Sequence, residues 1–151
     1  MIRYRKAAVS DIPDLARIRK IQLQDEGQSP ETDMDKELIG YFEDRMSSGD
    51  LVEWVAEDKH GEIIATAAFV FMDFPPAFTN PTGRKGYIAN MYTADRYRGQ
   101  GIATDLIKKL EQEARNRGIT KLVLHASEMG RKVYARIAFA ETDVVMEKDI
   151  D

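Results

Sequence analysis

Apolar and polar residues follow two different periods along this chain. The segments Ile2–Ala7 and Leu51–Glu57 alternate like strands with one covered face. The segment Ile63–Met72 is almost wholly apolar, which predicts a central strand covered on both faces. Apolar residues spaced by three and four positions predict helices, and the clearest of these begins near Gly101. The predicted element order is β-α-α-β-β-β-α-β-α-β, a mixed α/β (α+β) domain that spans residues 1–151.

Individual residues set the expected boundaries of the elements. Ser10 is the expected N-cap of a first helix that runs to about Leu23, and Thr32 is the expected cap of a second helix. Gly118 suits the C-terminal cap of the helix that begins near Gly101. The other predicted segments are a loop at Asp73–Gly86, strands at Tyr87–Thr93, Lys121–Ser127 and Asp143–Ile150, and a helix at Glu128–Ile137.

Composition narrows the class of protein. The 151 residues are 43% hydrophobic, enough for one domain with its own core. No stretch approaches the roughly 20 apolar residues of a membrane span, and the first residues lack the apolar run of a signal peptide, so we expect a cytoplasmic protein that does not bind membranes. With no cysteine, disulfides and thiolate metal sites are excluded, and no metal is expected. The net charge of −4 argues against binding to nucleic acid.

A pair of glycines between arginines precedes the helix that begins near Gly101, in the segment DRYRGQGIATDLI. The first turn of a helix has unpaired N–H groups and a partial positive charge, so it suits a phosphate. Gly99 and Gly101 bring no Cβ that would obstruct the approach of a ligand, and Arg96 and Arg98 add charge. The segment matches neither a P-loop nor the dinucleotide-binding pattern. A simple turn is the alternative interpretation.

The spacing of Arg96, Gly99 and Gly101 resembles the [QR]xxGx[GA] loop of the GNAT superfamily of acetyl-CoA-dependent N-acyltransferases. The resemblance extends over YIANMYTADRYRGQGIATDLI and the closing segment LHASEMGRKVYARIAFAETD, and before these it is limited to the order of elements. It implies a single GNAT-like domain, with a mixed, largely antiparallel sheet whose fourth and fifth strands separate and about four flanking helices. Ala138 departs from the family, which usually has glycine there; at a positive φ, alanine would cost about 1 kcal/mol.

The resemblance implies that acetyl-CoA is the cosubstrate. Its pyrophosphate would lie on the glycine-containing loop, and its pantetheine arm along the strand before it. The residues expected to bind it are Met91, Tyr92, Thr93, Arg96, Arg98, Gly99, Gln100, Gly101, Ile102, Ala103, Thr104 and Ser127. For Ser127, a helix cap is the alternative role.

The resemblance also implies a general acid, because Tyr134 matches the tyrosine that relatives direct at the CoA sulfur. The alternative is that Tyr134 packs in the core beside Phe139. An amine acceptor must lose a proton, and Asn90 stands where some relatives carry a glutamate, so the general base stays open. The candidate bases are Glu53, Asp73, His125 and Glu128.

These features predict an N-acetyltransferase that moves the acetyl group to a primary amine by direct attack in a ternary complex, because no cysteine can carry an acyl-enzyme. The acceptor is expected to be a small-molecule or peptide amine, with Phe74 and Phe78 walling its pocket unless their loop is a mobile surface loop. Members of the family often dimerise, so a homodimer is a further expectation. A non-catalytic acyl-CoA-binding or sensing module is the alternative function.

Overall fold

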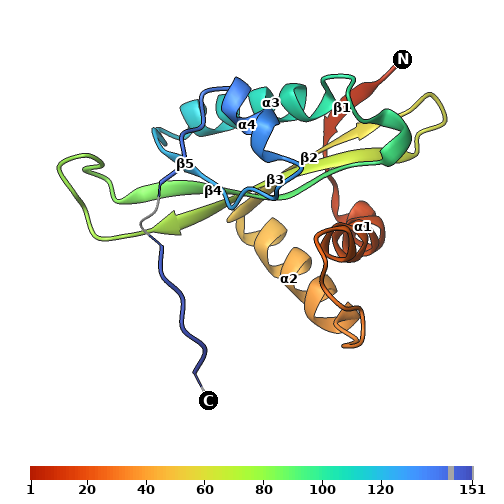
Figure 1. Ribbon diagram of the computed structural model, residues 1–151, viewed down its shortest axis with the longest axis horizontal. Helices are drawn as coiled ribbons and strands as arrows, with labels where there is room; N and C mark the ends of the chain where they lie inside the picture. The colour runs from red at the N-terminus through yellow and green to blue at the C-terminus, as the bar shows by residue number, and fades with distance from the viewer. Residues whose placement is uncertain (143–144, 151) are drawn as a thin grey trace.

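The sheet at the centre of the structure has the strand order β1-β2-β3-β4-β5 (Figure 1). This computed structural model describes residues 1–142 and 145–150. The strands are β1 (Arg3–Lys6), β2 (Leu51–Glu57), β3 (Ile63–Asp73), β4 (Arg84–Thr93) and β5 (Leu122–Val123). The helices are α1 (Ile12–Asp25), α2 (Asp35–Ser48), α3 (Ile102–Asn116) and α4 (Arg131–Arg136), with short 3₁₀ turns at Val9–Asp11 (η1) and Asp95–Tyr97 (η2).

The first four strands pair antiparallel, and β4 and β5 pair in parallel. The parallel pairing has two rungs only, Gly86 with Leu122 and Tyr87 with Val123, beyond which the strands separate. The mixed, largely antiparallel sheet with separating fourth and fifth strands was expected from the sequence, and this fold class is confirmed.

Helices cover both faces of the sheet, α1 and α2 on one and α3 and α4 on the other (Figure 1). β3 serves both layers, since every residue of Ile63–Phe69 is buried, as its unbroken apolar sequence predicts. The apolar side of α3 is buried as predicted, including Leu106 and Leu110. Burying a leucine side chain fully contributes about 1.5–3 kcal/mol, so this helix is a principal support of the sheet. None of the helices in the described part of the chain is long and apolar enough to cross a membrane.

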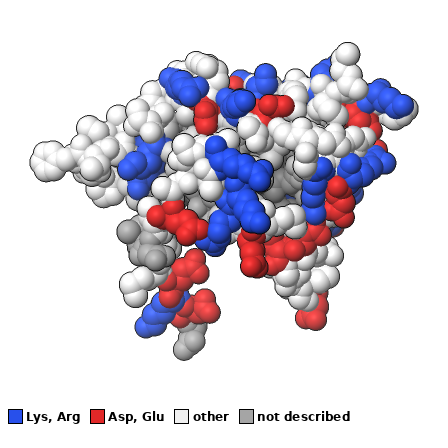
Figure 2. Space-filling model, turned by 45° about the horizontal axis from the view of Figure 1, so that its top comes forward, with Lys and Arg blue, Asp and Glu red and all other residues white. Residues whose placement is uncertain are grey.

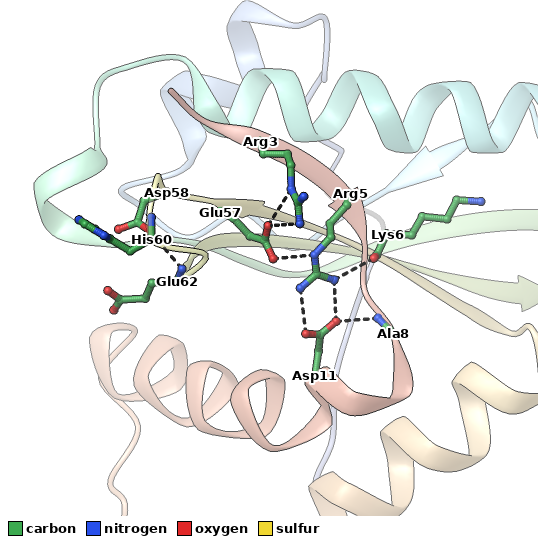
Figure 3. A network of polar contacts seen from close by, with 9 residues as sticks. All are labelled: Arg3, Arg5, Lys6, Ala8, Asp11, Glu57, Asp58, His60 and Glu62. Carbon is green, nitrogen blue, oxygen red and sulfur yellow. Dashed lines mark hydrogen bonds and ion pairs between the residues drawn. The ribbon is translucent and has the colours of Figure 1, made fainter.

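The start of α1 is held by a network of ion pairs (Figure 3). The guanidinium of Arg5 donates to both carboxylate oxygens of Asp11, at 2.7 and 2.9 Å, and to Glu57 on β2 at 2.6 Å. These bonds to Arg5 hold the pKa of both carboxyl groups below the usual range. Asp11 is also the N-cap of α1, so the prediction of Ser10 as cap was wrong; Ser10 lies in η1. The network therefore ties α1 to the edge of the sheet.

The start of α2 also differs from the prediction. Its N-cap is Met34, and the Asp33 carboxylate accepts the N–H of Asp35 at 3.1 Å. Thr32 is therefore not the cap, because the shorter helix leaves it in the preceding connection.

The connection between β3 and β4 is shorter than the predicted loop Asp73–Gly86. The two strands extend into it as a hairpin, with Asp73 opposite Arg84, which leaves residues 74–83 to connect them. The N–H of Phe74 donates to the carbonyl of Gly83 at 2.8 Å, and the Asn80 amide donates to the carbonyl of Arg84 at 3.1 Å. The prolines and glycines of this segment indicate a loop, but cross-strand pairing makes its two ends part of β3 and β4.

The C-terminal elements are also shorter than predicted. The strand expected at Lys121–Ser127 is limited to Leu122–Val123, because β5 parts from β4. The helix expected at Glu128–Ile137 is Arg131–Arg136, and the preceding turn is closed by the Ser127 hydroxyl, which accepts the N–H of Gly130 at 3.1 Å. Of the predicted strand at 143–150, residues 145–150 are not a strand, and residues 143–144 lie outside the described residues.

Ala138, which follows α4, has a φ of 71°, the positive value that its departure from the family suggested. We expect Ala138→Gly to raise the free energy of unfolding by about 0.5–1 kcal/mol, because glycine relieves the left-handed strain while losing more entropy on folding. For a chain of this size the melting temperature should rise by about 1–4 °C in a thermal denaturation.

The matched control is Ala135→Gly, an exposed position inside α4, which should lower stability by about 1 kcal/mol. An Ala138→Gly variant that melts at or below the wild-type temperature contradicts the assignment of strain.

Candidate active site

The loop before α3 presents a row of free backbone donors. Gly99 and Gly101 have φ values of 76° and 81°, and Gly101 is the N-cap of α3. Such values explain the glycines, and a Cβ built on either would meet nothing within 4 Å, so the space before them is open. Within the described part of the chain, no backbone hydrogen bond uses the N–H groups of residues 99–104. The loop therefore fits a phosphate-bearing ligand, as its sequence predicts.

The two arginines of this loop have different surroundings. Arg98 holds the loop in place, since its guanidinium donates to the carbonyl of Thr93 at 2.9 Å and pairs with Asp95 at 2.8 Å and Asp25 at 3.4 Å. Arg96 is largely exposed and pairs with Glu62 at 3.4 Å. Figure 2 shows basic and acidic side chains intermingled over the visible face. Of the two, Arg96 is the more available to a bound anion.

A β-bulge interrupts β4 beyond the two rungs that it shares with β5. Thr66 on β3 pairs with Tyr92 and Ala68 with Ala89, so Asn90 and Met91 together oppose one β3 residue. Asn90 has a φ of 54°, and the buried Thr66 hydroxyl donates to its carbonyl at 2.6 Å. The bulge turns the Asn90 side chain toward β2.

The Asn90 amide donates to the Glu53 carboxyl at 3.3 Å. Glu53 is 3% exposed and lies between Leu51 and Val55, which belong to the core beneath α1 and α2. Burial raises the pKa of Glu53 to about 8, against a lowering by the Asn90 hydrogen bond and the charge of Arg19. A carboxyl group with this pKa exchanges a proton readily near neutral pH, which suits a general base.

The other candidate bases lie elsewhere. Asp73 pairs with Arg84 at 3.1 Å on the hairpin, and Glu128 is exposed in the turn before α4. His125, on the chain beyond β5, is exposed and its Nδ1 lies 3.1 Å from the Tyr87 hydroxyl. The structure therefore places only Glu53, of the four, in contact with the bulge.

Tyr134 on α4 is 9% exposed, and its ring lies 6.0 Å from that of Phe139, so the packing predicted as its alternative role is present. Burial raises the pKa of Tyr134 to about 12, and the charge of Glu26 adds to the effect. The phenol therefore keeps its proton at neutral pH and is available as a donor.

The residues expected to wall an acceptor pocket are not beside Glu53. Glu53 pairs with Ala68, and Phe74 lies six residues further along that chain segment, about 20 Å away at strand spacing. Phe74 is 43% exposed and Phe78 is fully exposed. The structure thus puts these two side chains on the outer end of the hairpin.

Comparison with known protein families identifies the family of this chain. The sequence model of the Acetyltransferase (GNAT) family matches residues 15–139. The chain belongs to the GNAT family. This confirms three predictions from the sequence: the family, the fold and the enzyme class, an acyltransferase.

Solved and curated GNAT proteins resemble this chain to different extents. A crystal structure of a predicted acetyltransferase with acetyl-CoA from Clostridium acetobutylicum is 52% identical, with a TM-score of 0.95, and the match covers 99% of this chain and 96% of that one. Thialysine N-epsilon-acetyltransferase of Mus musculus is 25% identical over 86% of this chain and 77% of its own. An uncharacterized N-acetyltransferase of Bacillus subtilis is 39% identical, but over only 44% of this chain and 45% of its own length.

The partnership of Asn90 with Glu53 was not predicted from the sequence. A signal was available, since asparagine is among the few residues that adopt a positive φ, and Asn90 stands inside a strand pattern. Whether the strand bulges there depends on Thr66, which is distant in the sequence.

Substitution Gly101→Asp tests the loop as the site of the GNAT pyrophosphate. We expect acetyl-CoA affinity, measured by calorimetry, to fall at least about tenfold. The backbone N–H groups of the loop attract a phosphate, and the carboxylate of the new aspartate would repel it.

Gly49→Asp is the matched control: Gly49 ends α2 with a φ of 80° and similarly open space, so it carries the same backbone strain away from the loop. Equal affinities in wild type and Gly101→Asp, or equal losses in both variants, exclude the loop as the phosphate site.

Proposed function

We propose that this protein transfers the acetyl group of acetyl-CoA to a primary amine by direct attack in a ternary complex. The observation that carries the proposal is the buried Glu53, which receives a hydrogen bond from Asn90 at the β4 bulge and has a pKa of about 8. The bulge lies just beyond the point where β4 and β5 separate. A proton acceptor is therefore available where the strands part.

Acetyl-CoA is the acyl donor, as the sequence predicts. The relative that is 52% identical was crystallised with acetyl-CoA. The free N–H groups of residues 99–104 fit its pyrophosphate. In this proposal Ser127 closes the turn before α4, and the pantetheine arm runs along β4, beside residues 91–93.

Glu53 is the proposed general base. The amine arrives as an ammonium ion with a pKa of around 10, so a neutral nucleophile requires a proton acceptor, directly or through water. The carboxylate form of Glu53 can take that proton, since its pKa is close to neutral pH. The bulge takes Met91 out of register with β3, which makes its N–H the proposed donor to the thioester oxygen as charge develops there.

Tyr134 is the proposed general acid for the leaving sulfur. A thiol has a pKa of about 8.5, well below the value of about 12 for Tyr134, so full proton transfer to a free thiolate is uphill. The hydroxyl therefore acts mainly by donating a hydrogen bond while negative charge develops on the sulfur. Its packing beside Phe139 fixes the ring for this role.

An amine-panel assay with detection of free CoA tests the function. The panel should include amino acids, amino sugars, polyamines and a peptide with a free N-terminus, with hydrolysis of acetyl-CoA alone as the blank. Release of CoA with at least one amine supports an N-acetyltransferase. Tight acetyl-CoA binding without release across the panel supports the alternative, a non-catalytic binding or sensing module.

Substitution Glu53→Gln should lower kcat by about 10²- to 10⁴-fold, because an amide cannot accept the proton, while acetyl-CoA affinity stays unchanged. In the wild type kcat/KM should rise with pH and level off above about 8, as Glu53 loses its proton, and the variant should lack this rise. Glu43→Gln, exposed on α2, is the matched control and should behave as wild type. Full activity in Glu53→Gln rules out this base.

The same carboxyl group should affect stability. The pKa of Glu53 in the folded state is above the ordinary glutamate value of 4.5, so between the two values the folded state holds a proton that the unfolded state releases. The contribution of Glu53 to the free energy of unfolding is then greatest below pH 4.5 and is lost as pH rises through about 8. Glu53→Gln removes this loss, so denaturation at pH 9 should show a variant at least as stable as wild type. A variant clearly less stable at pH 9 contradicts the raised pKa.

Substitution Tyr134→Phe should lower kcat by about 10²-fold, because the donor to the sulfur is lost, with acetyl-CoA affinity and melting temperature nearly unchanged. The ring and its contact with Phe139 remain in the variant, which separates the acid role from packing. Steady-state kinetics and calorimetry give the two readings. Turnover equal to wild type refutes the acid assignment.

A further inference from the structure

The turn between β2 and β3, residues 58–62, contacts the loop before α3 through two adjacent side chains. The hydroxyl of Tyr97, in η2, donates to Oδ2 of Asp58 at 3.3 Å. The guanidinium of Arg96 pairs with the carboxylate of Glu62 at 3.4 Å. The row of free N–H groups begins two residues after Tyr97, so both contacts are made directly before the proposed phosphate site.

Asp58 is held in place by the turn itself. Its Oδ1 accepts the N–H of His60 at 2.8 Å and the N–H of Glu62 at 3.1 Å (Figure 3). The N–H of Gly61, which has a φ of 79°, donates to the carbonyl of Asp58 at 3.1 Å. The turn uses Oδ1 and the hydroxyl of Tyr97 uses Oδ2, so the hairpin presents a fixed acceptor to the loop.

Tyr97 carries this contact to the backbone of the loop. Its half-buried ring packs against the core that β3 shares with α3. Its N–H donates to the carbonyl of Ala94 at 2.8 Å, and the N–H of Ala94 donates to the carbonyl of Ile64 on β3 at 2.8 Å. The hydrogen bond to Asp58 fixes the outer end of the ring, and with it the 3₁₀ turn from which the loop continues.

The second contact is of a different kind. The side chains of Arg96 and Glu62 are each about two-thirds exposed, and such surface pairs add little to the rigidity of a loop. Glu62 instead places a negative charge beside the loop, where it competes with a phosphate for Arg96. The turn therefore carries two carboxylates, one that supports the loop and one that opposes an anion on it.

We propose that Asp58 is a positioning residue for acetyl-CoA: through the Tyr97 hydroxyl it holds the N–H groups of residues 99–104 in place before the pyrophosphate arrives. Donors that are already in place need no ordering on binding, which raises affinity. By charge alone a carboxylate near a phosphate weakens binding, so position and charge predict opposite signs for the loss of Asp58. This role requires that the loop binds the pyrophosphate, as in the proposed function, and the Gly101→Asp variant tests that requirement separately.

Calorimetry with acetyl-CoA on variants at both ends of the hydrogen bond tests the proposal. Tyr97→Phe removes only the hydroxyl and should weaken binding about three- to tenfold. Asp58→Ala should weaken binding at least as much, and adding Tyr97→Phe to it should cause no further loss. Asp58→Asn removes the same charge but keeps an acceptor for the turn and a donor for the hydroxyl, so it should lose less than Asp58→Ala.

Two other carboxylates are the controls. Asp50 stands directly before β2, as Asp58 stands directly after it, and accepts the hydroxyl of Ser48 at 3.1 Å, so Asp50→Ala should leave affinity unchanged. Glu62→Gln removes a charge from the same turn and should bind acetyl-CoA as tightly as wild type or more tightly, because Arg96 is released for the anion.

A second readout separates positioning from a general structural role. S-acetylpantetheine carries the thioester but lacks the pyrophosphate, so kcat/KM is compared for this donor and for acetyl-CoA with one amine that wild type accepts. In Tyr97→Phe the ratio of acetyl-CoA to S-acetylpantetheine should fall about three- to tenfold, through KM rather than kcat. A merely structural defect would lower kcat/KM for both donors alike.

Any one of three results overturns the role of Asp58 and leaves the proposed function intact: unchanged affinity in Tyr97→Phe, tighter binding in Asp58→Ala, or an equal loss in Asp50→Ala. If Asp58→Ala does not fold, Tyr97→Phe decides, because it keeps both the ring and the turn. A wild type that binds acetyl-CoA but acetylates no amine overturns the proposed function, and calorimetry still decides the role of Asp58.

Discussion

The geometry of the candidate active site depends on one buried hydrogen bond, from the Thr66 hydroxyl to the carbonyl of Asn90 at 2.6 Å. It holds β4 in a bulge at a residue with a φ of 54°. A regular strand would turn the Asn90 side chain to the opposite face, because a shift of one residue reverses the faces of a strand. With the bulge, the amide meets Glu53, and the strand interruption lies beside the parting of β4 and β5. Backbone geometry thus brings together the two side chains on which the proposed acid–base chemistry depends.

Two glutamates of β2 show how surroundings determine the role of a carboxyl group. Glu57 and Glu53 are both nearly buried and four residues apart on one strand. Glu57 receives Arg3 and Arg5, which lower its pKa, and it holds the first strand and α1 in place. Glu53 receives one neutral amide, and burial raises its pKa. The first is structural and the second is suited to proton transfer.

Most of the fold could be predicted from periodicity and from the resemblance to the GNAT superfamily. The unbroken apolar run of β3 and the apolar spacing of α3 indicate their buried positions, and the glycine pair marks the loop before α3. What failed depends on contacts that periodicity does not show. Asp11, not Ser10, is the N-cap of α1, and its carboxylate pairs with Arg5. The hairpin extends further than predicted because β3 and β4 pair up to Asp73 and Arg84. The preference for Glu53 among the four candidate bases also required the three-dimensional structure, because its contact with Asn90 depends on the bulge.

The two-rung junction of β4 and β5 has a consequence for the dynamics of the molecule. Among the residues that the structure describes, the chain from β5 onward is joined to the sheet ladder only through Gly86 with Leu122 and Tyr87 with Val123, whereas β3 and β4 are paired along most of their length. Segments with so few ladder bonds open by local unfolding at a lower free energy than the global transition. We therefore expect the amide hydrogens of α4, the helix that carries Tyr134, to exchange with solvent sooner than those of β3 and β4, and a ligand bridging β4 and β5 to slow that exchange.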